Sequence, residues 1–151
     1  MSQFHLYKLA VLSIIAVFIT IEFAYTQNAA DIEQAGEDQV KLITPEDASE
    51  IIKENSGNPD FVILDVRTPG EYSQSHIESS VNIDFRSPSF KDEVGKLDRG
   101  KTYLLHCRSG QRSAGAAVVM EQMGFTDIYD MDGGMLRWEK DGLPVVKEQR
   151  Y

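Results

Sequence analysis

The sequence predicts an α/β domain with a central, mostly parallel sheet flanked by helices. Short apolar runs rich in β-branched and aromatic residues alternate along the chain with segments of helical spacing. The connections between these segments are short, which is typical of strands and helices that alternate around one sheet. The run 61–64 is apolar at every position, as expected for a parallel strand covered on both faces.

The expected elements follow from local signals along the chain. Five strands are expected, at 41–43, 61–64, 81–83, 102–106 and 127–129. Thr44 is a good N-cap residue and Pro45 suits the first helical position, so a helix should begin at Pro45 and stop at 55–57. Further helices are expected at 71–73, 88–97 and 113–123, with a short final one opened by Gly133-Gly134.

The first 26 residues differ in kind from the rest of the chain. Lys8 precedes an apolar block at 9–21 and small residues follow it, a pattern typical of a secretory signal peptide. A retained anchor is the alternative, although the block is short for a membrane span and Glu22 interrupts it. We therefore expect an exported, periplasmic or otherwise extracytoplasmic protein, or one anchored in the membrane and facing outside the cytoplasm. The expected parts are a signal peptide or anchor at 1–26, a flexible linker at 27–40, the folded domain at 41–147 and a tail at 148–151.

Composition narrows the classes of function. The formal net charge is −9 and no basic cluster is present, so nucleic acid is not an expected partner. A membrane contact is expected only through a retained N-terminal segment. Cys107 is the only cysteine, which rules out an intramolecular disulfide and leaves no pattern for a metal site. We expect a monomer without a metal.

The segment 103–114 carries the strongest functional signal. Apolar residues lead into Cys107, a polar turn follows, and small residues then begin a helix. Backbone N–H groups at a helix start have no partner within the helix, and the helix dipole adds positive potential. A thiolate is stabilised there, so the pKa of Cys107 should fall below its usual value of about 8.5. The other candidate residues of this loop are Arg108, Ser109, Gly110, Gln111, Arg112 and Ser113.

Two charged residues, Asp65 and Arg67, end the second expected strand. Because the carboxyl ends of parallel strands meet at one edge of a sheet, Asp65 is expected to face the same crevice as Cys107. A structural role is still the preferred interpretation, with Arg67 paired to Glu71 or to Asp65. His106 should point to the opposite face of its strand from Cys107, so we do not interpret it as a base.

Three segments in order carry a resemblance to a known family. The first is LDVRTPGEY at 64–72 with HIE at 76–78 and VNI at 81–83; the second is CRSGQRS at 107–113; the third is DGGM at 132–135 with Trp138 and GLP at 142–144. On these motifs the chain resembles single-domain rhodaneses over residues 42–145. Two positions depart from the family's pattern: Ser75, where glycine is usual, and Asp84, where proline is common. The resemblance implies the family's three-layer domain.

The resemblance also implies a sulfurtransferase of the thiosulfate sulfurtransferase type that works through a Cys107 persulfide. The thiolate would take a sulfane sulfur from thiosulfate or a polysulfide and pass it to cyanide, a thiol or a protein cysteine. Backbone N–H groups of 108–113 would hold the persulfide anion. Arg108 and Arg112 would attract and orient the small anionic donor, and no cofactor is implied.

Two alternatives remain open. Tyrosine phosphatases also place a cysteine loop before a helix, but five residues separate their cysteine from the phosphate-binding arginine, whereas four separate Cys107 from Arg112. A phosphatase or arsenate-reductase activity is the runner-up, and the lack of a second cysteine weakens the reductase interpretation. The other alternative is a non-catalytic carrier that loads Cys107 with persulfide sulfur for a partner.

Overall fold

The structure, a computed structural model, describes residues 40–147. The expected signal peptide or anchor, nearly all of the expected linker and the tail lie outside these residues. One sheet is formed by β1 Val40–Ile43, β2 Phe61–Asp65, β3 Val81–Asn82, β4 Thr102–His106 and β5 Ile128–Met131. The strand order is β1-β5-β4-β2-β3, and every pairing in the sheet is parallel.

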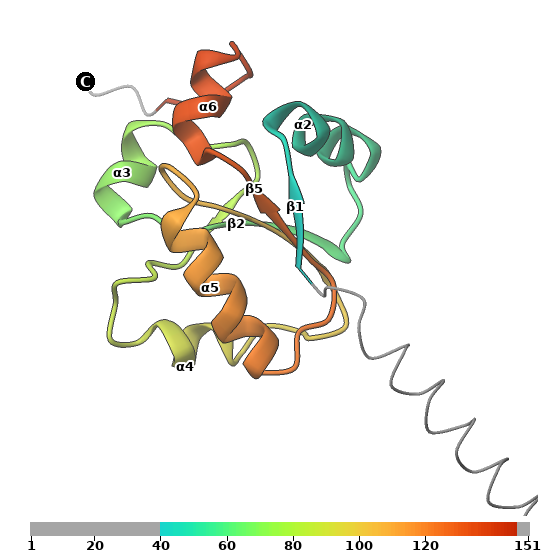
Figure 1. The fold of residues 1–151 in the computed structure, drawn as a ribbon, viewed down its shortest axis with the longest axis vertical. Coiled ribbons are helices and arrows are strands. Elements are labelled where there is room, and N and C mark those ends of the chain that lie inside the picture. The colour runs from blue at the N-terminus through green and yellow to red at the C-terminus, as the bar shows by residue number, and fades with distance from the viewer. Residues whose placement is uncertain (1–39, 148–151) are drawn as a thin grey trace, which may run out of the picture. The chain divides into compact units, whose positions relative to one another are not determined.

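Helices cover both faces of this sheet. They are α2 Pro45–Glu54, α3 Pro69–Gln74, α4 Phe90–Val94, α5 Gln111–Gln122 and α6 Gly134–Lys140. Figure 1 shows α4 and α5 on one side of the strands and α2 on the other. The predicted α/β fold with flanking helices is confirmed. Among residues 40–147, no helix has the length and apolar character that a membrane crossing requires.

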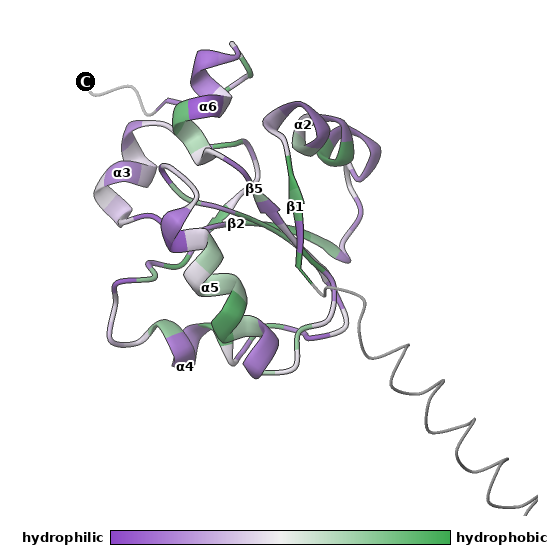
Figure 2. Ribbon diagram, viewed as in Figure 1, coloured by the Kyte–Doolittle hydropathy of each residue, from purple (hydrophilic) through white to green (hydrophobic). Residues whose placement is uncertain are grey.

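Two apolar clusters fill the layers between sheet and helices. The cluster under α4 and α5 contains Leu105, Cys107, Ala116, Met120 and Phe90. The cluster on the opposite face, under α2 and α6, contains Ala48, Leu104, Met131, Met135 and Trp138. Figure 2 shows hydrophobic residues along the strands and on part of α5, whereas α3 is polar.

One N-terminal motif starts both α2 and α3. Thr44 and Thr68 each form a capping box with the residue three positions later. Pro45 and Pro69 follow the two caps, so both helices begin with a fixed backbone angle. The expected start at Pro45 is confirmed. α3 begins two residues before its expected range, and this places Glu71 in its first turn.

The helix α4 is shorter than the expected range 88–97. The N–H of Phe90 binds the carbonyl of Ser87, and the N–H of Leu97 binds that of Val94. These bonds join residues three apart, as in single 3₁₀ turns, so the α-helical ladder does not extend beyond Phe90–Val94.

The helix α5 begins two residues before the expected Ser113. The carbonyl of Gly110 accepts the N–H of Ala114 at 3.0 Å and so makes the first helical bond. Gln111, Arg112 and Ser113 therefore form the first turn of α5, where backbone N–H groups lack partners within the helix.

Candidate active site

Cys107 lies directly after β4, where a loop leads into α5. The residue is 1% exposed and belongs to the cluster under α5. The backbone N–H of Gly110 donates to Cys107 Sγ at 3.2 Å. The loop thus turns back on the sulfur and brings backbone donors to it.

Two opposing effects set the pKa of the Cys107 thiol. Burial raises it, because the thiolate loses water. Backbone N–H groups of Ser113, Ser109 and Arg112, together with the Ser113 hydroxyl, lower it because these polar groups favour the charged sulfur. The second effect prevails, so the pKa of Cys107 lies below its ordinary value, in the predicted direction.

The outer side of the loop is held by the start of α6. The N–H of Met135 donates to Cys107 O at 2.8 Å, and the N–H of Leu136 donates to Arg108 O at 3.0 Å. Because these carbonyls are bound to α6, the N–H groups of the loop can face the sulfur. A Cβ on Gly134 would lie 2.9 Å from Arg108 O. The backbone of Gly134 also has a φ of +55°, in the left-handed region, so both space and backbone conformation require glycine at this position. Gly134 was not predicted as a site residue, although paired glycines are a signal of close backbone approach.

Arg112 is held by a partner at the site. Its guanidinium donates to Glu71 of α3, at 2.8 Å from Nη1 and 2.7 Å from Nη2. Glu71 also accepts the hydroxyl of its cap Thr68 at 2.9 Å. The bonds from Arg112 hold the pKa of Glu71 down at about 2, so the pair remains ionised near neutral pH. The charge that Arg112 was expected to offer to an anionic donor is therefore partly neutralised.

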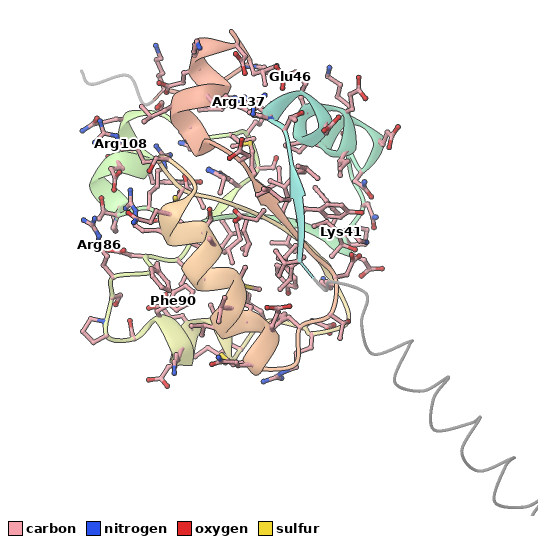
Figure 3. The ribbon with its side chains drawn as sticks, in the orientation of Figure 1. Lys41, Glu46, Arg86, Phe90, Arg108 and Arg137 are labelled. Carbon is pink, nitrogen blue, oxygen red and sulfur yellow. The ribbon has the colours of Figure 1, made fainter. Side chains whose placement is uncertain are left out.

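A pocket opens at the mouth of the loop. It has a volume of about 380 Å³ and is lined by Glu71, Arg86, Arg108, Ser109, Gln111 and Arg112. Within residues 40–147, neither Arg86 nor Arg108 forms an ion pair. Figure 3 shows these two side chains on the same side of the molecule. Arg86 was missed because it lies outside the cysteine loop and belongs to no motif. The two exposed guanidiniums give an acidic chain a local attraction for small anions.

The sequence match to a family model completes this picture. The model of the rhodanese-like domain matches residues 45–141. The chain belongs to this family. It is 32% identical to the thiosulfate sulfurtransferase GlpE of Pseudomonas syringae over 100 residues, which are 66% of this chain and 88% of that protein. It is 28% identical to the thiosulfate:glutathione sulfurtransferase of Saccharomyces cerevisiae over 126 residues, 76% of this chain and 89% of the relative.

Solved structures agree with this assignment. A rhodanese-related protein from Thermoplasma volcanium shares 34% identity with a TM-score of 0.62, and the match covers 72% of this chain and 99% of that one. The resemblance to single-domain rhodaneses is thus confirmed. Relatives named as thiosulfate sulfurtransferases support a sulfurtransferase role for this rhodanese domain.

Asp65 lies on the face of the rhodanese sheet opposite to Cys107, because it follows Ile63 of the other cluster by two residues. Its carboxylate accepts bonds from Arg67, at 2.9 Å from Nε and 2.6 Å from Nη2, and both residues are buried. Arg67 Nη2 also donates to the carbonyl of Ser75 at 2.6 Å. The structural pairing of Arg67 with Asp65 is confirmed. Pairing of Arg67 with Glu71 is wrong, and so is the expectation that Asp65 faces the crevice of Cys107.

His106 is buried beside this pair, with Nε2 3.8 Å from Asp65 Oδ2. Burial lowers the pKa of His106 to about 4, so the ring is neutral near neutral pH. Neither ring nitrogen has a hydrogen-bond partner in the described part of the chain. The ring lies on the opposite face from Cys107, as predicted, and does not serve the thiol as a base. No group of three or more potential ligands within residues 40–147 could hold a metal ion.

Proposed function

We propose that this rhodanese domain moves a sulfane sulfur from thiosulfate or a polysulfide to a thiophilic acceptor through a persulfide on Cys107. The observation that carries the proposal is the surroundings of the thiol. The sulfur accepts the N–H of Gly110, and its pKa is lowered despite burial. A thiol in such a setting reacts as the thiolate nucleophile.

The first half-reaction charges the enzyme. The Cys107 thiolate attacks the outer sulfur of thiosulfate, a new S–S bond forms, and sulfite leaves with the electron pair of the broken S–S bond. The product is a persulfide anion, whose outer sulfur lies about 2 Å from Cys107 Sγ. In the second half-reaction an acceptor such as cyanide or a thiolate attacks this outer sulfur, and the Cys107 thiolate is restored.

The loop supports both half-reactions electrostatically. Backbone N–H groups of 108–113 are fixed by the start of α5 and by α6, so they stabilise the anion without having to reorient. Arg108 attracts the anionic donor, with Arg86 beside it at the pocket mouth. Arg112 contributes more weakly to donor attraction because Glu71 is its partner.

The proposed sulfur donor is a small anion, and the proposed acceptors are thiophiles. The name of the yeast relative, a thiosulfate:glutathione sulfurtransferase, supports a low-molecular-weight thiol as one acceptor. A protein cysteine offers the same nucleophile and is a further proposed acceptor. We propose a monomer that binds no nucleic acid, in keeping with the net charge of −9.

Intact mass spectrometry of the purified protein tests the sulfur transfer. After incubation with thiosulfate, we expect a gain of one sulfur that later treatment with cyanide removes. Cys107→Ser is the matched control and should gain nothing. A gain that neither cyanide nor a thiol removes would favour the carrier alternative. If no sulfur is gained, assays with phosphate esters and with arsenate would test the alternative phosphatase or arsenate-reductase activity.

Export is a separate proposal that rests on the sequence pattern of residues 1–26. The full chain would be expressed in a bacterial host, and the periplasmic fraction would be analysed by N-terminal sequencing. A mature chain that begins near residue 27 supports a cleaved signal peptide. A full-length chain in the membrane fraction supports the anchor, and a full-length chain in the cytoplasm contradicts both.

A further inference from the structure

Two arginines at the mouth of the cysteine loop carry positive charge that no carboxylate balances. The pocket there is lined by the exposed Arg86 and Arg108 and by the pair of Arg112 with Glu71. Because Arg112 and Glu71 form an ion pair at 2.7 Å, their charges largely cancel. Among residues 40–147, Arg86 and Arg108 form no ion pair. The pocket therefore keeps a net positive charge, on a chain whose formal net charge is −9.

A local turn places Arg86 at this pocket. The N–H of Arg86 donates to Asp84 Oδ1 at 2.9 Å, and the N–H of Ser87 donates to Asp84 O at 3.0 Å. The first bond is that of an Asx turn, and the second closes the backbone turn that contains Arg86. Asp84 is a position at which the chain departs from the rhodanese pattern, where proline is common. Since proline has no side-chain acceptor, the Asx turn that holds Arg86 depends on this departure.

The same segment is anchored to α5 by the ring of Phe85. The ring meets that of Phe90 edge to face, with centroids 5.1 Å apart. It also packs closely on Gly115 of α5, where a Cβ would lie 2.9 Å from Phe85 Cζ. The backbone next to Arg86 is thus fixed relative to the helix whose first turn lines the pocket. Figure 3 shows Arg86 and Arg108 on the same side of the molecule.

The size and lining of the pocket indicate an organic ligand. Its volume of about 380 Å³ lies in the range of sites that take organic molecules, roughly 300–1,000 Å³, whereas thiosulfate is a compact inorganic anion. Besides the arginines, the pocket presents the exposed Ser109 and Gln111. Their hydroxyl and amide groups can bind the N–H and C=O groups of a peptide. The pocket therefore suits a short peptide thiol that carries carboxylates.

Positive charge at the pocket matters most when the acceptor arrives. An acceptor thiolate attacks the outer sulfur of the persulfide anion on Cys107, so two anions must meet. A new S–S bond forms to the acceptor, the S–S bond to Cys107 breaks, and its electron pair restores the Cys107 thiolate. Carboxylates on the acceptor add repulsion from an acidic chain unless cations bind them. The planar fork of an arginine binds a carboxylate through two parallel hydrogen bonds.

We propose that Arg86 determines acceptor specificity: its guanidinium binds a carboxylate of the acceptor beside Arg108, so that an anionic peptide thiol is preferred to one without carboxylates. Asp84 positions Arg86 for this contact. The inference rests on the proposed sulfur transfer and names the class of acceptor that the site selects.

Glutathione and its diethyl ester test this preference, because they share one thiol and the ester masks both carboxylates. Protein loaded from thiosulfate and freed of excess donor is mixed with either acceptor at equal thiolate concentration, and intact mass follows the loss of bound sulfur. Glutathione should react about tenfold faster, the effect of one charged hydrogen bond. In Arg86→Gln the ratio should fall to about threefold or less. Lys53→Gln is the matched control, because it removes one positive charge from α2, on the other side of the sheet, and it should keep the wild-type ratio. A wild-type ratio near one, an unchanged ratio in Arg86→Gln, or equal slowing of both acceptors would overturn the proposal.

Two substitutions of Asp84 separate the position of Arg86 from simple charge. Asp84→Asn removes the negative charge but keeps a side-chain oxygen for the N–H of Arg86, whereas Asp84→Ala removes both. We expect Asp84→Asn to keep the preference for glutathione and Asp84→Ala to lose part of it. Equal preferences in the two variants would refute the positioning role of Asp84.

Binding to the unloaded protein needs no sulfur transfer. S-methylglutathione keeps both carboxylates but has no thiol to accept sulfur. It should shift the backbone N–H signals of Arg86 and Gln111 saturably in NMR spectra of the wild type, whereas its diethyl ester should not. In Arg86→Gln the affinity read from Gln111 should fall about tenfold. No saturable shift would overturn the inference even where sulfur loads normally. If the protein loads no sulfur, the proposed function fails, and this titration still decides whether Arg86 recognises the carboxylates.

Discussion

The contact between α6 and the cysteine loop gives a prediction whose size follows from the structure. In Gly134→Ala the new Cβ would meet the backbone of Cys107 and Arg108, with Arg108 C at 2.8 Å and Arg108 O at 2.9 Å. Backbone atoms of a packed loop cannot yield as a flexible side chain can. The left-handed conformation costs a non-glycine residue about 1–2 kcal/mol and overpacking about 1–3 kcal/mol. We therefore expect a loss of about 2–5 kcal/mol in the free energy of unfolding.

The control for this substitution lies two residues after the C-terminal end of the same helix. Gly142 also has a positive φ, +72°, but a Cβ there would meet nothing within 4 Å. Gly142→Ala should therefore lower the free energy of unfolding only by the cost of the left-handed backbone conformation, about 1–2 kcal/mol. The difference between the two variants in urea unfolding isolates the contact of Gly134 with the loop.

The two variants should also differ in catalytic activity. Displacing the loop turns backbone N–H groups away from the sulfur, and losing one such donor typically costs about 10²-fold or more in rate. We expect kcat/KM for thiocyanate formation from thiosulfate and cyanide to fall by about 10²-fold in Gly134→Ala, and to stay unchanged in Gly142→Ala. Equal unfolding free energies for the two variants, with full activity in both, would refute the reasoning.

Three further predictions concern charged groups. Glu71→Gln should remove a part of the unfolding free energy that depends on pH. The pKa of Glu71 is lowered from 4.5 to about 2 in the folded protein. Its carboxylate therefore stabilises the fold above pH 4.5, and this stabilisation is lost as the pH falls toward 2. Urea unfolding at neutral and acid pH checks this, and an unchanged pH dependence in the variant would contradict it. Arg67→Ala should cost about 3–5 kcal/mol, because it leaves the buried Asp65 carboxyl without its ion-pair partner. Sulfur loading per folded molecule should be retained, and a loss of loading without a loss of stability would give Arg67 a direct role. Asp130→Asn should gain stability relative to wild type as the pH rises. The Asp130 pKa is raised from 3.8 to about 6, so the wild type loses stability as the pH rises through that range, by about 3 kcal/mol in total. Urea unfolding at about pH 4 and about pH 8 measures the difference, and parallel pH profiles of the two proteins would contradict it.

Local signals were sufficient for most of the fold. The cap at Thr44, the proline after it and the continuous apolar run of β2 act over a few residues, so their elements could be predicted with nearly correct bounds. The predicted bounds failed where the hydrogen bonds of a local turn or cap decided the end of a helix. The α4 segment carries apolar residues at helical spacing but is stopped by three-residue turns on both sides.

The candidate site was likewise predictable from the sequence only in part. By itself, the sequence determined the family and singled out Cys107 as the candidate nucleophile with its loop, because the features that stabilise a thiolate at a helix start come from consecutive residues. Only the tertiary structure decided the partners. Arg112 meets Glu71 across 41 positions of the chain, and Gly134 reaches the Cys107 loop from a separate helix. Asp130 comes under α5 only because β5 pairs with β4 in the order of the sheet. Such contacts depend on how distant segments are placed side by side, and local patterns of spacing and propensity carry no information about that placement.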